Sequence, residues 1–146
     1  MDGEELSGTL GYRLAHVCKA HHFRVRQLLH EIGLYRGQQF VLCALWREEG
    51  VTHSELAEHL SVHPATVSNA LRRMEQAGFL ERRPDPEDQR ISRVYLTPEG
   101  RDIRSAVERV WAKLEKETLR GFTNEERRSL ESFLQRIHEN LEKTEP

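Results

Sequence analysis

Residues 52–78 constrain the fold most, because they carry the start and stop signals of two short helices joined by a tight turn. Thr52 stands at an N-cap position and Glu55 completes a capping box, so we expect a helix to begin there. Pro64 ends that helix and opens another, because proline has no amide proton to donate and fits the first helical position. Gly78 can take the left-handed conformation that closes the second helix.

The second of these helices has one apolar and one polar face. Val67, Leu71 and Met74 recur at the spacing of a buried face. The opposite face suits the major groove of DNA, with small residues for close approach, polar groups for base edges and arginines for guanine or phosphate. We therefore expect it to bind DNA through Ala65, Thr66, Ser68, Asn69, Arg72 and Arg73. A solvated surface helix of a small helical domain would show the same pattern.

A short β-hairpin is expected directly after Gly78. Two extended segments, 80–83 and 90–96, flank a run with two prolines and two aspartates, which is typical of a turn. A hairpin in this place is a wing, and we expect Arg90 and Arg93 to reach the flanking DNA backbone or minor groove. Asp85 and Asp88 are expected to shape the turn and to orient an arginine. A plain surface hairpin with scattered charges is the alternative.

The charge balance is unfavourable for binding nucleic acid. The formal net charge is −2, and residues 63–93 hold six arginines against five acidic residues. Because phosphate neutralisation supplies much of the affinity for DNA, a positive surface requires a geometry that turns these acids away from the DNA.

Long amphipathic helices are expected at both ends of the chain. Residues 6–32 and 98–121 each carry an apolar stripe, and a capping box at Thr123 and Glu126 precedes a third striped helix. The apolar run within 39–47 fits a buried strand or a buried helix, and its composition favours a helix buried nearly all round. The terminal stripes lack a partner in their own chain, so we expect a homodimer that places two DNA-binding helices about 34 Å apart.

These patterns predict a winged helix-turn-helix at 35–97 and a helical dimerisation region formed by 1–34 and 98–146. No apolar run approaches the ~18–20 residues that cross a bilayer, and the N-terminus is acidic where a signal peptide is basic, so we expect a cytoplasmic protein. Cys18 and Cys43 form no CxxC motif and are expected to be buried small hydrophobic residues.

Two segments together resemble the MarR family of winged helix-turn-helix regulators: SELAEHLSVHPATVSNALRRMEQAGFLER at 54–82, and PDPEDQRISRVYLTPEG at 84–100. The resemblance implies a mainly α fold with a small β-hairpin wing. It also implies a dimeric, sequence-specific transcriptional regulator, usually a repressor, with Arg90 in the minor groove. Family members often have Ser, Asp or Arg where this chain has His63, and a basic residue where it has Asn69. Asn69 therefore favours the recognition of an adenine over a phosphate contact.

The resemblance also implies an effector, a small aromatic or lipophilic anion bound between the first long helix and the winged domain. Residues that can line such a site are Tyr12, His16, Phe40 and Trp46, although ordinary core and boundary side chains fit these positions as well. Some relatives sense peroxides through a cysteine in the first helix, which makes a redox sensor using Cys18 an alternative. Cys18 lies on the apolar stripe, which favours a structural thiol.

Other classes of function have little support. His16, His21, His22 and His30 lie on one helix, but the adjacent His21 and His22 do not face a single ion, so we expect no metal site. We expect neither an enzyme nor a cofactor, because the chain has no Gly-rich phosphate loop, no His-Glu-x-x-His motif, and no Ser or Cys nucleophile near a base. A winged-helix protein-interaction module that uses Asn69 and Arg72 on a protein partner remains the rival hypothesis.

Overall fold

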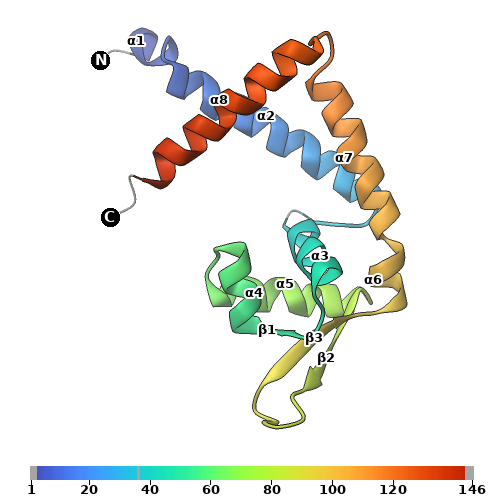
Figure 1. Ribbon diagram of the computed structural model, residues 1–146. Coiled ribbons are helices and arrows are strands. Elements are labelled where there is room, and N and C mark those ends of the chain that lie inside the picture. Colours follow the sequence, from blue (N-terminus) through green and yellow to red (C-terminus); the bar gives the residue numbers. More distant parts are fainter. Residues whose placement is uncertain (1–2, 36, 144–146) are drawn as a thin grey trace. The chain divides into compact units, whose positions relative to one another are not determined.

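The computed structural model describes residues 3–35 and 37–143, and the chain divides into two compact units, Met1–Trp111 and Ala112–Pro146. The fold is mainly helical with a small sheet, as predicted (Figure 1). Its helices are α1 (Gly3–Ser7), α2 (Leu10–Glu31), α3 (Gln38–Arg47), α4 (His53–Leu60), α5 (Pro64–Gln76), α6 (Pro98–Asp102), α7 (Arg104–Thr118) and α8 (Asn124–Glu142). Its strands are β1 (Val51–Thr52), β2 (Leu80–Pro84) and β3 (Ser92–Leu96).

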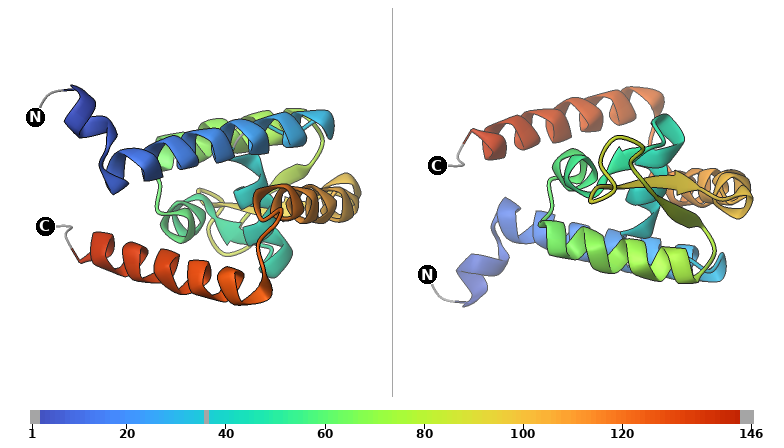
Figure 2. Two further views of the ribbon diagram at one scale, coloured as in Figure 1. Left: turned by 90° about the horizontal axis from the view of Figure 1, so that it is seen from above. Right: turned by 90° about the horizontal axis from the view of Figure 1, so that it is seen from below.

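The predicted helix-turn-helix is confirmed in α4 and α5. The Thr52 hydroxyl accepts a hydrogen bond from the Glu55 amide at 3.2 Å, and the Glu55 carboxylate accepts one from the Thr52 amide at 2.8 Å. Pro64 occupies the first turn of α5, and Gly78 has a φ of 84°. The Phe79 amide then donates to the Met74 carbonyl at 3.0 Å, which satisfies the end of the helix. The view from below in Figure 2 shows α4 and α5 beside the hairpin.

The sheet has one strand more than the predicted hairpin. β3 pairs antiparallel with β2, with Arg83 opposite Arg93, and also with β1, where Val51 lies opposite Val94. Strand β1 has two residues and no alternating pattern, so the sequence offered no signal for it. It ties the start of the helix-turn-helix to the wing, because Thr52 is both its second residue and the N-cap of α4.

Helix α3 supplies the centre of the core. Val41, Leu42 and Leu45 are at most 2% exposed, which confirms the predicted helix, but Phe40 is 52% exposed, so the helix is not buried all round. At its C-terminal end the Trp46 indole donates to the carbonyl of Gly100 at 2.9 Å. A Cβ at Gly100 would lie 2.0 Å from the Phe79 carbonyl oxygen, so only glycine fits where α6 meets the end of α5.

Two predicted helices are each divided. The segment 6–32 forms α1 and α2, because the Thr9 hydroxyl accepts from the Tyr12 amide at 3.2 Å and caps a new helix. The segment 98–121 forms α6 and α7, with Ile103 between them. Only the C-terminal half of α2 is buried in the chain, through Val25, Leu28 and Leu29. Its N-terminal half leaves apolar side chains in solvent, Leu10 at 84% and Val17 at 63% exposure.

The second unit ends in α8, which begins at the predicted capping box: the Thr123 hydroxyl accepts from the Glu126 amide at 3.2 Å, and the Glu126 carboxylate accepts from the Thr123 amide at 2.7 Å. The apolar stripe of α8 is exposed along its length at Phe133, Leu134, Ile137 and Leu141. Along residues 3–35 and 37–143, no helix combines the length and the apolar character needed to span a bilayer.

Candidate nucleic-acid interface

The polar face of α5 lies in solvent as the sequence predicted. The six residues assigned to it are all exposed, whereas Val67, Leu71 and Met74 are at most 2% exposed. None of the six is acidic. The Arg72 guanidinium donates to the Asn69 side-chain oxygen at 3.5 Å, which leaves the Asn69 amide group free to donate outward. The exposed face of α5 therefore offers hydrogen-bond donors and positive charge.

Four of the five acidic residues of 63–93 are held in ion pairs, and Glu87 is in none within the described part of the chain. Glu75 binds Arg82 at 2.6 Å, Asp85 binds Arg93 at 2.5 Å and Asp88 binds Arg90 at 3.0 Å. Glu81 binds Arg83, which also lies over the ring of Tyr95 at 4.4 Å. Within the described part of 63–93, these pairs leave Arg72 and Arg73 as the arginines without an acidic partner. The overall balance of charge is therefore near zero, but the unpaired positive charge is concentrated on α5.

Asp85 organises the wing, as the sequence suggested. One of its carboxylate oxygens accepts from the amides of Glu87 and Asp88, at 2.8 and 3.1 Å, and the other accepts from Arg93. These hydrogen bonds, above all the one from Arg93, hold the pKa of Asp85 below its ordinary value. Arg93 also donates to the Gly50 carbonyl at 2.7 Å. The structure thus places Arg93 as a tie between the wing and β1 rather than as a residue that extends from the tip.

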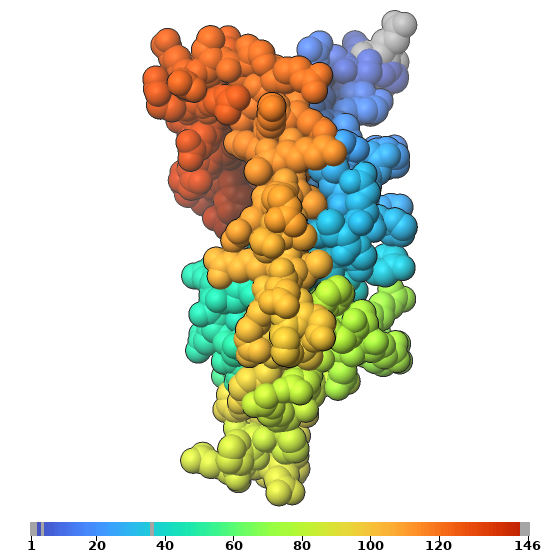
Figure 3. Space-filling model, turned by 90° about the vertical axis from the view of Figure 1, so that its right-hand side faces the viewer, coloured from blue at the N-terminus to red at the C-terminus, as the bar shows by residue number. Residues whose placement is uncertain are grey.

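Arg90 lies in the turn of the wing, before β3 begins. Its side chain is 90% exposed, and both its amide and its guanidinium donate to Asp88, at 3.1 and 3.0 Å. Figure 3 shows the yellow-green hairpin tip projecting beyond the domain. An exposed arginine at a projecting tip has the geometry of a side chain that enters a narrow groove.

A half-buried histidine that sequence reasoning missed lies where α4, α5 and β2 meet. His53 is the first residue of α4, and its Nε2 atom is buried without a hydrogen-bond partner in the described part of the chain. Burial lowers the pKa of His53, and the positive charge of Arg82 lowers it further, against the opposing effect of Glu75. His53 is therefore neutral near pH 7 and lies close to the Glu75–Arg82 ion pair.

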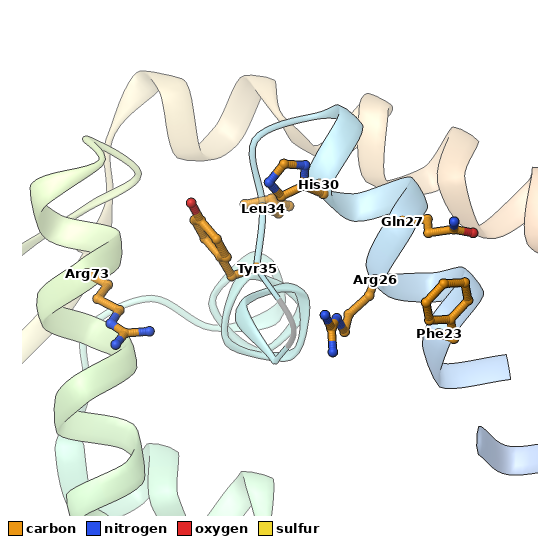
Figure 4. Close-up of a pocket in the computed structure, with 7 residues that line it drawn as sticks. All are labelled: Phe23, Arg26, Gln27, His30, Leu34, Tyr35 and Arg73. Carbon is orange, nitrogen blue, oxygen red and sulfur yellow. The ribbon is translucent and has the colours of Figure 1, made fainter. Parts of the chain in front are cut away.

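A cavity of about 680 Å³ opens between α2, the following turn and α5 (Figure 4). Arg26 and Arg73 extend toward each other from α2 and α5, with Tyr35 between them. The lining has aromatic and cationic members and no acidic one: Phe23, Arg26, Gln27, His30, Leu34, Tyr35 and Arg73. The edge of the His30 ring meets Tyr35, with centroids 5.9 Å apart. Such a lining suits an aromatic anion.

The four residues that the sequence offered for an effector site do not surround this cavity. Tyr12 and His16 contact each other, with ring centroids 4.6 Å apart. Phe40 lines a separate apolar cavity of about 390 Å³. The indole of Trp46 donates its hydrogen bond to the Gly100 carbonyl. Sequence reasoning missed the lining of the larger cavity because its residues come from three segments that only the fold brings together.

The cysteines are less buried than predicted. Cys18 is exposed on α2, in the same half of the helix that leaves Leu10 and Val17 in solvent. Cys43 is partly buried, and burial raises its thiol pKa. Among the described residues, no group of three or more histidine, cysteine, aspartate or glutamate side chains is arranged to hold a metal ion.

The chain is similar to known regulators over most of its length. The model of the MarR family matches residues 34–92. The uncharacterized HTH-type transcriptional regulator YdgJ of Bacillus subtilis is 30% identical over 113 residues, 77% of this chain and 69% of YdgJ. The HTH-type transcriptional regulator TtmR of Methylorubrum extorquens is 29% identical over 96% of this chain and 71% of TtmR. A mutant MarR of E. coli, solved in complex with operator DNA, superposes with a TM-score of 0.80 and 27% identity over 94% of this chain and 99% of that chain.

Proposed function

The chain belongs to the MarR family of transcriptional regulators, and from this premise we propose that it is a homodimeric repressor of a pseudo-palindromic operator, released by a small aromatic carboxylate. The exposed face of α5 is the observation that carries the proposal. It presents Arg72 and Arg73 without acidic partners, while four neighbouring acids are held by arginines of the wing. Unpaired arginines can neutralise DNA phosphates, so this arrangement of charge makes α5 the main DNA-binding element, with the hairpin in a supporting role.

In this proposal, residues 35–97 form the DNA-binding region. Helix α5 enters the major groove, Ser68 and Asn69 contact base edges, and Arg72 and Arg73 contact phosphate or guanine. Arg90 reaches the flanking minor groove from the wing tip. Arg93 supports this contact indirectly, because it holds the wing to Gly50 and Asp85.

Residues 1–34 and 98–146 form the dimerisation region in this proposal. Two exposed apolar rows support it, one on the N-terminal half of α2 and one on α8. Exposed rows of this kind on a regulator are commonly covered by a second copy. Replacing Ile137 in the row of α8 with glutamate is expected to convert a dimer to a monomer in sedimentation velocity, whereas Gln135→Glu, outside the row, is the matched control.

The cavity between α2 and α5 is proposed as the effector site. The guanidinium groups of Arg26 and Arg73 would hold a carboxylate, and Tyr35 and Phe23 would contact an aromatic ring. Because Arg73 belongs to α5, a molecule in this cavity would act directly on the DNA-binding helix. This geometry supports relief of repression by a ligand, at residues other than those the sequence suggested.

The DNA-binding part of the proposal is tested by fluorescence anisotropy with the DNA upstream of the protein's own gene, at two salt concentrations. We expect tight binding at low salt and a steep loss of affinity as salt rises, with a shuffled duplex of equal length as the control. Absence of binding at low salt, or binding indifferent to salt, would contradict the proposal and would favour the protein-interaction hypothesis.

The effector site is tested by thermal unfolding with salicylate as the probe. A ligand that prefers the folded state raises the melting temperature, and Arg26→Ala is expected to abolish that rise. Arg13→Ala, an exposed arginine of α2 outside the cavity, should retain it. An equal rise in both variants would place the ligand elsewhere.

A further inference from the structure

The backbone amides of residues 65–67, at the start of α5, all donate to His63. Pro64 has no amide proton, and the Ala65 amide donates to Nδ1 of His63 at 3.3 Å. The amides of Thr66 and Val67 donate to the carbonyl of His63 at 3.0 and 3.4 Å. The amides of residues 65–67 are therefore already engaged within the helix, where a helix N-terminus often offers such groups to a phosphate.

The hydrogen bond from the Ala65 amide sets the role of each ring nitrogen of His63. Nδ1 accepts that hydrogen bond through its lone pair, so the ring N–H donor is on Nε2. The two ring nitrogens point in nearly opposite directions, so Nε2–H points away from the helix. The side chain is exposed, and its ring is held by the cap at Nδ1.

Other helices of the chain use a simpler cap. Thr9, Thr52, Thr97 and Thr123 each accept an amide proton of their helix through a hydroxyl group. In two of these caps the hydroxyl proton is itself bound within the chain, because Thr9 donates to the Leu6 carbonyl and Thr97 donates to the Gly78 carbonyl. The imidazole of His63 caps its helix through Nδ1 and keeps a second nitrogen on the far side of the ring, at the end of the helix that carries the candidate DNA-binding residues.

We propose that His63 is a DNA-contacting residue whose Nε2–H donates a hydrogen bond to the DNA, in place of the helix amides that its own cap occupies. The inference rests on the proposed docking of α5 in the major groove. The acceptor is a phosphate oxygen or a base-edge acceptor such as guanine O6 or N7, because both offer lone pairs to a donor and neither requires a charge on the imidazole.

The test compares His63→Thr with His63→Asn in anisotropy titrations against the operator. Threonine keeps the cap that the chain uses elsewhere and leaves only a hydroxyl close to the backbone in place of the Nε2–H on the far side of the ring, so we expect an unchanged melting temperature and about tenfold weaker binding, the scale of one hydrogen bond. Asparagine can cap through its oxygen and donate through its amide group, so it should recover most of that loss. Wild-type affinity in His63→Thr, or equal weakness in both variants, would overturn the proposal.

A panel of single-base-pair operator variants identifies the acceptor. If Nε2–H binds a phosphate, His63→Thr weakens all operators equally, and if it binds a base edge, the loss is confined to one position. The wild-type protein is titrated first, because failure of the wild type to bind would reject the proposed function itself, whereas normal wild-type binding with a silent His63→Thr rejects only the role of His63.

Discussion

Helix α5 carries two arginines and the wing region carries four, and the two regions use them in opposite ways. In the wing region, Arg82, Arg83, Arg90 and Arg93 each bind a carboxylate of the chain. On α5, within the described residues, Arg72 and Arg73 bind none. The difference shows that a count of charges does not locate an electrostatic surface, because the paired arginines of β2 and β3 stabilise the wing, whereas the unpaired arginines of α5 remain available for an external anion.

Among the substitutions that test this difference, replacing both Arg72 and Arg73 with alanine should change operator binding most. We expect operator affinity to fall by about 100-fold or more, and the dependence of log K on log salt to become shallower by about 2, because two phosphate contacts are lost. Titrations at four salt concentrations measure both quantities. Arg83→Ala is the matched control from the wing, and an equally large change of slope there would remove the distinction between the two regions.

Asp85→Ala should loosen the wing. The substitution removes the acceptor of two turn amides and of the Arg93 guanidinium, so we expect a melting temperature lower by several degrees and weaker operator binding. Differential scanning calorimetry and anisotropy measure the two effects. Asp88→Ala breaks an ion pair at the exposed tip and should leave the melting temperature nearly unchanged; equal losses in both variants would contradict the central role of Asp85.

Arg90→Ala should have a smaller effect, confined to DNA. The arginine is exposed at the wing tip, so its loss should weaken operator binding by about three- to tenfold without changing the oligomeric state measured by sedimentation. Arg90→Lys should recover part of the affinity through its charge. Unchanged affinity in Arg90→Ala would show that the wing supports α5 without touching DNA.

Acid pH should lower the free energy of unfolding through His53, which lies near Glu75 of α5 and Arg82 of the wing. Burial lowers its pKa in the folded state, so the unfolded chain binds the proton first as pH falls below about 6.5. The contribution of His53 to stability is therefore complete above that pH and declines below it. Urea denaturation from pH 7.5 to 5 should show the decline in the wild type and a flatter profile in His53→Gln. Parallel profiles would assign the pH dependence to other groups.

The sequence by itself determined the local architecture. The capping boxes at Thr52 and Thr123, the proline that opens α5 and the glycine that closes it were all predicted and confirmed, because each depends on groups a few residues apart. The division of α5 into a buried and an exposed face followed from periodicity for the same reason.

Only the tertiary structure decided how distant residues pair. Strand β1 exists because it pairs with β3, and Arg93 is turned inward by Asp85 and by Gly50, 43 positions away in the sequence. The cavity of Arg26, Tyr35 and Arg73 joins three separate segments. The availability of Arg72 and Arg73 depends on ion pairs formed by other arginines. Each of these properties depends on the positions of side chains that are distant in the sequence. The local periodicity of the chain carries no information about those positions.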